Sequence, residues 1–178
     1  MKKIIFAIVI ALFLAGIVIA VGELYNPLWK ATINSELSEY KDDFILGVGK
    51  PAKDIYDSTD ILKAPMAPGK SIIIQSVVNN RALAGDYRAD ITIGTSKKWK
   101  LTLIASDAVG IGGNETLTWD LEKVPRKVKL TLIDYGTDST RSKIVKTINI
   151  KTISSYSFNV PNKVGAYRYI DIKATKTF

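Results

Sequence analysis

The sequence predicts an all-β fold, an antiparallel β-sandwich that follows a short apolar N-terminal segment. From about residue 29 onward, apolar and polar residues alternate with a period of two, which is typical of strands that are buried on one face. Clusters of Gly, Pro, Asn and Asp separate these stretches, and short strands at such regular spacing indicate a sandwich. No stretch after residue 22 shows a helical period of 3.6, and no alternation of strands with helices suggests a parallel sheet.

The N-terminal segment predicts export. Lys2 and Lys3 precede an apolar run from Ile4 to Val21, and small residues lie at the offsets of a signal-peptide cleavage site. Cleavage is expected before Val21 or before Glu23. The positive amino end places the following domain outside the cytoplasm, so we expect a secreted or cell-surface protein.

A retained membrane anchor is the alternative for this segment. The apolar run has 18 residues, which just suffices to cross about 30 Å of hydrocarbon. No cysteine follows the run to carry a lipid, so we do not expect a lipoprotein anchor. The cleaved and the anchored forms both stay open at this point.

The chain divides into three parts. They are a signal peptide or N-terminal membrane anchor over 1–22, a stem or edge strand over 23–42, and the sandwich domain over 43–178. The stretch from 50 to 70 is rich in proline and aspartate and is expected to be a long crossing loop with room for one short strand. Strands are expected at 29–35, 44–49, 71–79, 87–94, 98–105, 115–121, 126–134, 143–151, 155–160 and 166–175.

Strand parity identifies the expected core, because alternate residues point to the same face. The inward residues are expected to be Trp99, Leu101, Leu103, Ala105, Leu117, Trp119, Leu121, Val128, Leu130, Leu132, Tyr156, Phe158 and Val160. Their neighbours are expected to face water on one Lys- and Thr-rich side: Lys98, Lys100, Thr102, Thr116, Thr118, Asp120, Lys127, Lys129 and Thr131.

The composition excludes several classes of enzyme. The chain has no histidine and no cysteine, so a Ser-His-Asp triad, a Cys-His dyad and any zinc site with a histidine ligand are excluded. After the export segment the glutamates are few, and nothing in the sequence places two of them about 5–9 Å apart, as glycoside hydrolysis requires. They are Glu23, Glu36, Glu39, Glu115 and Glu122. We therefore expect no catalytic residues.

The net charge of +8 has two interpretations. The lysines are scattered along strand-like stretches, without a run of five and without interleaved aromatic residues, so we expect no nucleic-acid partner. A solvated lysine face that protects sheet edges is one interpretation. Attraction to an anionic wall polymer or membrane surface is the other.

Several motifs together resemble a known group of modules. In order they are Leu46-Gly47-Val48 with Pro51 and Pro68-Gly69, Asp86-Tyr87-Arg88-Ala89-Asp90, Trp99-Lys100-Leu101-Thr102-Leu103, Leu117-Thr118-Trp119-Asp120-Leu121 with Val124-Pro125, Leu132-Ile133-Asp134 and Ser155-Tyr156-Ser157-Phe158. This order resembles the Ig-like β-sandwich modules of secreted and cell-surface prokaryotic proteins, including the FlgD-type Ig-like group, over roughly residues 43–173. The resemblance implies an immunoglobulin-like sandwich with an accessory role, and it carries over no catalytic residue.

The candidate metal ligands are Asp54, Asp57 and Asp60, which stand three residues apart in the crossing loop. Calcium binds carboxylates that a loop gathers around it. The alternative, which we prefer, is local capping, in which each Asp side chain accepts hydrogen bonds from backbone N–H groups in turns. We therefore expect no cofactor, with calcium as the one candidate.

Two further residues are candidates for surface roles. Trp29 lies outside the core pattern and is the candidate for an exposed aromatic contact. Asn114 begins an Asn-Glu-Thr sequon on an expected loop and is the candidate for N-glycosylation.

These observations favour a non-catalytic extracellular or cell-surface module for binding, adhesion or scaffolding. Its partner would be a protein or an anionic cell-surface polymer, and it would contact the membrane only through an uncleaved N-terminal segment. The alternative is a self-associating structural protein of a surface filament or layer. In that alternative, residues 23–37 would add as a strand to the open sheet edge of a neighbour.

Overall fold

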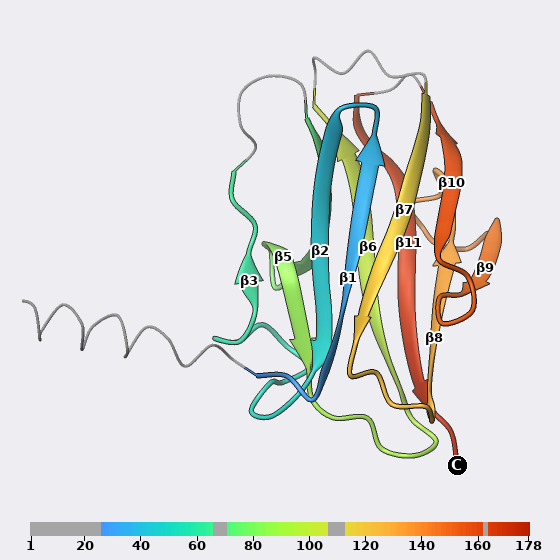
Figure 1. The fold of residues 1–178 in the computed structure, drawn as a ribbon. Coiled ribbons are helices and arrows are strands. Elements are labelled where there is room, and N and C mark those ends of the chain that lie inside the picture. Colours follow the sequence, from blue (N-terminus) through green and yellow to red (C-terminus); the bar gives the residue numbers. More distant parts are fainter. Residues whose placement is uncertain (1–25, 66–70, 107–112, 162–163) are drawn as a thin grey trace, which may run out of the picture.

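The computed structural model of the chain describes residues 26–65, 71–106, 113–161 and 164–178. These residues form strands and loops without a helix, so the all-β prediction is confirmed, while the apolar N-terminal segment lies outside the described residues. None of the described residues belongs to a helix that is long and apolar enough to cross a membrane. The strands (Figure 1) are β1 (Trp29–Leu37), β2 (Tyr40–Val48), β3 (Ile61–Leu62), β4 (Ile72–Val78), β5 (Arg81–Arg88), β6 (Ser96–Ala105), β7 (Gly113–Glu122), β8 (Val128–Asp134), β9 (Lys146–Asn149), β10 (Ser155–Val160) and β11 (Gly165–Lys176).

The described strands belong to one mixed sheet. Its order is β10-β7-β1-β2-β5-β4-β6-β11-β8-β9, and β3 pairs with β5 beside this path. The pairings are antiparallel except for one: β2 and β5 run parallel where residues 45–48 meet residues 85–88. A continuous mixed sheet thus takes the place of the two separate antiparallel sheets that the sequence predicts.

The sheet curls until its two parts face each other across a shared core (Figure 1). We call β10, β7, β1 and β2 the first wall, and β4, β6, β11, β8 and β9 the second wall. Trp29 of the first wall meets Trp99 of the second edge-to-face, with ring centroids 6.0 Å apart. The contact shows that side chains from both walls fill one interior, as they would in a sandwich.

Alternate residues along the strands form the core, as the period of two predicts. Leu101 and Leu103 of β6, Leu117 of β7 and Leu130 of β8 are fully buried. Leu121 is the exception among the expected core residues, because it lies at the end of β7 and keeps 36% of its surface exposed. Strand parity therefore identifies most of the core before the arrangement of the walls is known.

β5 connects the two walls by changing its partner along its length. Its first residues pair with β4, and its last residues pair with β2. Gly85 lies where the partner changes, and a Cβ at this position would lie 2.9 Å from the Cδ1 atom of Ile61 in β3. The sequence predicts this strand at 87–94, six residues too late. Gly85 and Asp86 are residue types that usually form turns, but here their pairing with other strands holds them in an extended conformation.

β1 lies inside the first wall, where the sequence predicts a stem or an edge strand over 23–42. It pairs with β2 on one side and with β7 on the other. The sequence does not predict this hairpin, because β2 starts with charged residues and lacks an apolar pattern there. One of these residues, Asp42, accepts a hydrogen bond of 2.8 Å from the Ile74 amide and forms an ion pair with Lys63. The filament hypothesis would donate residues 23–37, but residues 30–37 are already paired on both sides within their own chain.

Trp29→Ala should lower the free energy of unfolding by about 3–5 kcal/mol, because it removes a large buried ring and leaves a cavity against Trp99. Denaturant-induced unfolding measures the change. Thr118→Ala, on the exposed side of β7, is the control and should change stability by less than about 1 kcal/mol. Equal midpoints for the two variants would contradict the core shared by the two walls.

Candidate functional site

The outward side of the second wall carries a group of lysines. Lys98 and Lys100 project from β6, Lys129 from β8 and Lys173 from β11, each alternating with buried residues of its strand. We call these four residues the lysine face. Lys98, Lys100 and Lys129 are exposed, and Lys173 is half-buried. Because β11 lies between β6 and β8, the four positive charges occupy three adjacent strands.

The register of β6 and β11 sets one pair of like charges opposite each other. Lys98 lies directly opposite Lys173, whereas Lys100 lies opposite Asp171, and Lys129 of β8 lies opposite Thr175. Like charges directly opposite one another destabilise a sheet. Lys98 is partly compensated by the Asp171 carboxylate at 3.3 Å, whereas the other three lysines form no ion pair with any described residue.

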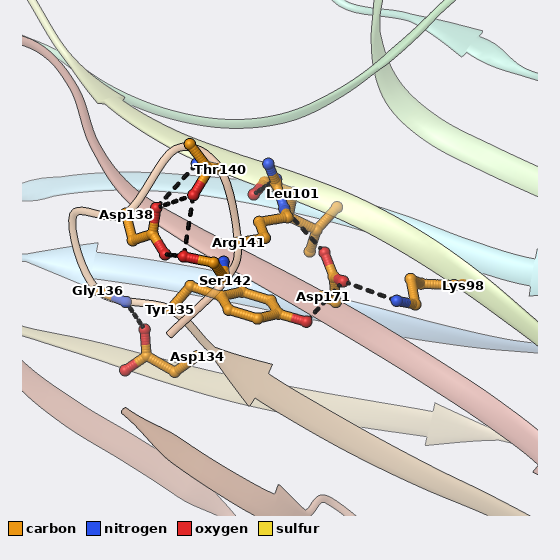
Figure 2. Close-up of polar contacts among 10 residues, drawn as sticks. All are labelled: Lys98, Leu101, Asp134, Tyr135, Gly136, Asp138, Thr140, Arg141, Ser142 and Asp171. Carbon is orange, nitrogen blue, oxygen red and sulfur yellow. Dashed lines mark hydrogen bonds and ion pairs between the residues drawn. The ribbon is translucent and has the colours of Figure 1, made fainter. Parts of the chain in front are cut away.

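Asp171, the carboxylate of this face, is already engaged (Figure 2). It is 1% exposed and accepts hydrogen bonds from the Tyr135 hydroxyl at 3.1 Å and from Arg141 Nε at 2.9 Å. Arg141 Nη2 also donates to the carbonyl oxygen of Leu101 at 2.9 Å, and its guanidinium lies 5.1 Å from the ring centre of Tyr169. Arg141 therefore fastens the loop between β8 and β9 onto β6 and β11.

Asp138 gives this loop its shape (Figure 2). Its carboxylate accepts hydrogen bonds from the amides and hydroxyls of Thr140 and Ser142, at 2.6–2.9 Å, and from the amide of Lys143 at 2.8 Å. These hydrogen bonds, above all that from the Thr140 hydroxyl, hold the pKa of Asp138 well below its ordinary value. The loop is thereby held with Arg141 over Asp171.

The two outward faces differ in chemistry. The sequence places Lys98 and Lys100 on one wet side with Thr116 and Thr118, but the structure puts the lysines on the second wall and the threonines on the first. The outward side of the first wall has a polar groove of about 480 Å³, lined by Asn34, Ser35, Glu36, Lys41, Asp42, Asp43, Thr116 and Thr118. The lysine face, in contrast, is suited to anions, since lysine presents a compact, solvated positive charge.

A second polar cluster is buried between the walls. The carboxylate of Glu115 in β7 accepts hydrogen bonds from the hydroxyls of Ser35 in β1, at 2.5 Å, and of Tyr167 in β11, at 2.6 Å. Burial raises the pKa of Glu115 above its ordinary value, although the two hydroxyls act in the opposite direction. Burial, followed by the nearby Glu115 carboxylate, also raises the pKa of Tyr167. This cluster joins β1 and β7 of the first wall to β11 of the second.

Asp134 continues the buried cluster toward the end of the sheet. It pairs with Arg168 and accepts hydrogen bonds from the Tyr156 hydroxyl at 2.6 Å and the Gly136 amide at 2.8 Å. The Arg168 guanidinium lies 3.7 Å from the ring centre of Phe158. Burial, then the hydrogen bond to Asp134, raises the pKa of Tyr156 to about 12. Side chains of β10 thus contact β8 and β11 across the interior.

We interpret this buried cluster as structural. The carboxylates of Glu115 and Asp134 accept hydrogen bonds from the chain's own groups, which is how buried polar atoms are normally satisfied. The sequence named Glu115 only as a glutamate without a catalytic partner, and it did not single out Arg168. Both occupy inward positions of apolar strands, and a charge at such a position must find a buried partner. That is the signal by which the cluster could have been found.

Two of the three aspartates of the crossing loop cap backbone amides, and the third forms an ion pair. Asp57 accepts hydrogen bonds from the amide and hydroxyl of Thr59, and Asp60 accepts them from the amides of Asp57 and Tyr87. Asp54 forms an ion pair with a lysine of β6. Asp57 and Asp60 thus have the contacts that the capping interpretation describes, whereas the Asp54 side chain contacts a lysine. Among the described residues, no three acidic, histidine or cysteine side chains converge as a metal site requires.

The structure contradicts the prediction that Trp29 is a surface contact. Its side chain is 2% exposed and packs on Trp99, because β1 belongs to the core that the sequence assigned to residues 43–178. Asn114 is exposed, but it lies in β7 opposite Asn159 of β10 rather than in the expected loop.

Comparison with known proteins bears on the N-terminus. Residues 1–16 match the model of a prokaryotic membrane lipoprotein lipid attachment site. The match covers the positive start and most of the apolar run, and the chain has no cysteine whose thiol would carry the lipid. The chain is therefore an exported protein, secreted or at the cell surface. No curated protein and no solved structure matches it.

Glu115→Gln should change how stability depends on pH. The raised pKa means that the folded state holds the Glu115 proton more tightly than the unfolded state does. The stability that this proton contributes is therefore present at low pH and is lost as the pH rises through the raised pKa. Gln stays neutral, so the unfolding free energy of the variant relative to the wild type should increase from about pH 4 to 8. Urea unfolding at a series of pH values measures the difference.

A second buried carboxylate contributes to the pH dependence of both proteins. The pKa of Asp86, which burial raises to about 6 against the effect of Arg88, gives both proteins a further loss of stability between about pH 4 and 6. A constant difference for Glu115→Gln would contradict the raised pKa.

Millimolar calcium should leave the melting temperature unchanged, because the carboxylates of Asp57 and Asp60 are already used as caps. Differential scanning calorimetry with calcium and with a chelator measures this. A rise with calcium that Asp57→Asn abolishes would overturn the capping interpretation.

Proposed function

We propose that the chain is a non-catalytic, exported module that binds an anionic polymer of the cell surface through its lysine face. The direct opposition of Lys98 and Lys173 carries this proposal. Repulsion between these two ammonium groups lowers the stability of the sheet. An anion that lies across β6 and β11 would reduce this repulsion. Asp171, the carboxylate opposite Lys100, already contacts Tyr135, Arg141 and Lys98.

An extended polyanion suits this surface better than a small ligand. The lysines are spread over three adjacent strands, which are about 4.8 Å apart. Flexible ammonium groups recognise repeated negative charges without demanding one geometry. Phosphate or carboxylate groups along a wall polymer have this chemistry.

The distribution of charge supports one orientation. The outward side of the first wall carries Glu36, Asp43, Asp120 and Glu122, and two of these carboxylates are paired with lysines of the same wall. A polyanion would therefore be attracted to the second wall and repelled from much of the first. Such an asymmetry orients a domain that approaches an anionic surface.

Two finer predictions belong to this proposal. The absence of histidine and cysteine supports a non-catalytic role. The meeting of two walls across one core supports kinship with the Ig-like modules of secreted and cell-surface prokaryotic proteins, in which binding or adhesion is the accessory role expected. The parallel pairing of β2 with β5 is the feature that departs from an antiparallel sandwich.

Neutralising two lysines should weaken binding. For the variant with Lys100→Gln and Lys129→Gln we expect a loss of about 2 kcal/mol, roughly 30-fold in affinity, at about 1 kcal/mol for each lysine near an anionic surface. Binding of the purified protein to immobilised polyphosphate and polyglutamate measures this. The affinity of the wild type should also fall with rising salt.

A matched variant separates this surface from net charge. Lys41→Gln with Lys53→Gln removes the same charge from two exposed lysines outside the lysine face and should bind like the wild type. Equal losses in both double variants would refute binding at the lysine face, because diffuse attraction to a basic protein would then suffice.

A further inference from the structure

The two ends of the sheet are protected differently. β9 and β10 are its terminal strands. β9 has four residues, starts with Lys146 and lies between Lys143 and Lys151 in the sequence. Short length and lysines are devices that prevent an edge strand from pairing with another chain. β10 has neither device: it has six residues, Ser-Tyr-Ser-Phe-Asn-Val, without a charge or a proline.

One side of β10 is unpaired. The strand pairs with β7 along its whole length, from Ser155 opposite Thr118 to Val160 opposite Gly113. On its other side, no strand of the described residues is hydrogen-bonded to it, because β10 ends the strand order of the sheet. Alternate residues of such a strand direct their N–H and C=O groups outward, where they can template a further strand.

The side chains of β10 do not cover this edge. The Tyr156 hydroxyl bonds to Asp134, and the Phe158 ring contacts Arg168, so both side chains are directed into the interior. Ser157 lies on the outward face, where its hydroxyl is 2.9 Å from the hydroxyl of Thr116 in the neighbouring strand. These side-chain contacts are with β8, β11 and β7, and none of them is made along the unpaired edge.

Exposed apolar side chains flank the strand in sequence. Ile153 lies just before β10 and Val164 just after it, with 48% and 51% of their surfaces exposed. Ile153 also lines a shallow groove of about 280 Å³ with Trp119 and Leu121 of β7. Exposed apolar groups that gather near one strand are typical of a surface that a partner covers.

We propose that β10 pairs antiparallel with β10 of a second copy of the chain and so joins two curled sheets into one. A two-fold pairing buries both edges at once and needs a strand that is complementary to itself. β10 meets this condition because it has no charge to oppose a like charge. β9 does not meet it, since Lys146 and its flanking lysines would face those of the second copy.

The geometry of the sheet limits the register. Inward side chains of one copy must lie beside inward side chains of the other, so two opposed residues must both be inward or both be outward. The two-fold axis between the copies then passes through a residue, and near the middle of the strand this residue is Ser157 or Phe158. With the axis at Ser157, Tyr156 opposes Phe158 and Ser155 opposes Asn159. With the axis at Phe158, Ser157 opposes Asn159. Both registers place uncharged polar pairs on the outward face, and the lysine face takes no part in either.

Single cysteines test the pairing in the full exported chain, which has no cysteine of its own. Opposed residues in an antiparallel pair have Cβ atoms about 4.5–5.5 Å apart, close enough for a disulfide after a small adjustment. Ser157→Cys should form a disulfide-linked dimer on a non-reducing gel if the axis lies at Ser157. If it lies at Phe158, Ser157→Cys should cross-link to co-expressed, differently tagged Asn159→Cys instead.

Thr118→Cys is the matched control, since it lies on the same outward face one strand in from the edge and should give no dimer. Either cross-linked register supports the proposal. Absence of a dimer in both tests, or an equal yield with Thr118→Cys, overturns it. Cross-linking of Ser157→Cys to a different protein also overturns it, because the edge would then serve a foreign strand.

Discussion

β5 pairs with β4 over its first residues and with β2 over its last, and the shape of the molecule depends on this change of partner. Between these two pairings the sheet turns back on itself, so that β1 and β6, which are not neighbours in the sheet, share a core through Trp29 and Trp99. A Cβ at Gly85 would crowd the Ile61 side chain of β3 beside this point. A single backbone ladder thus provides both walls of the interior.

The curl brings the two ends of the sheet near each other without joining them by backbone hydrogen bonds. Buried polar groups stabilise this region instead: Glu115 links β1, β7 and β11, and Asp134 links β8, β10 and β11. A buried polar group without a hydrogen bond would lower the stability of the folded state. The hydrogen bonds among these groups therefore favour this arrangement of the walls over other arrangements that would bury the same apolar residues. The same incomplete closure leaves the edge of β10 open.

The sequence predicted the parts of the fold that follow from alternation alone. β6, β7, β8 and β11 and the buried positions of Trp99 and Trp119 were predicted because each strand has a regular apolar face. The start of β2 was missed because its charged residues contact Ile74 and Lys63 of other elements, which a local pattern does not contain. The position of β5 was wrong for the same reason, since pairing holds Gly85 in a strand.

The candidate site shows the same limit. Parity predicted that Lys98, Lys100 and Lys129 face water, but it could not predict that they share a wall with Lys173 and not with Thr116. Which outward residues become neighbours depends on strand order, and strand order depends on contacts far apart in the sequence. The Asp138 loop was missed because its hydrogen bonds involve short polar side chains that also occur in ordinary turns.

The central place of β1 also has a mechanical consequence. The chain enters β1 at the end of the sheet where β11 finishes (Figure 1), and β1 is paired along its length with β2 and β7. A force that pulls the amino end along β1 acts perpendicular to the hydrogen bonds that join β1 to β2 and β7. Many of these hydrogen bonds then resist the force together and do not open one after another. A domain held by its amino end at one side and by a polymer on β6, β8 and β11 at the other would transmit tension through a strand that is paired on both of its sides.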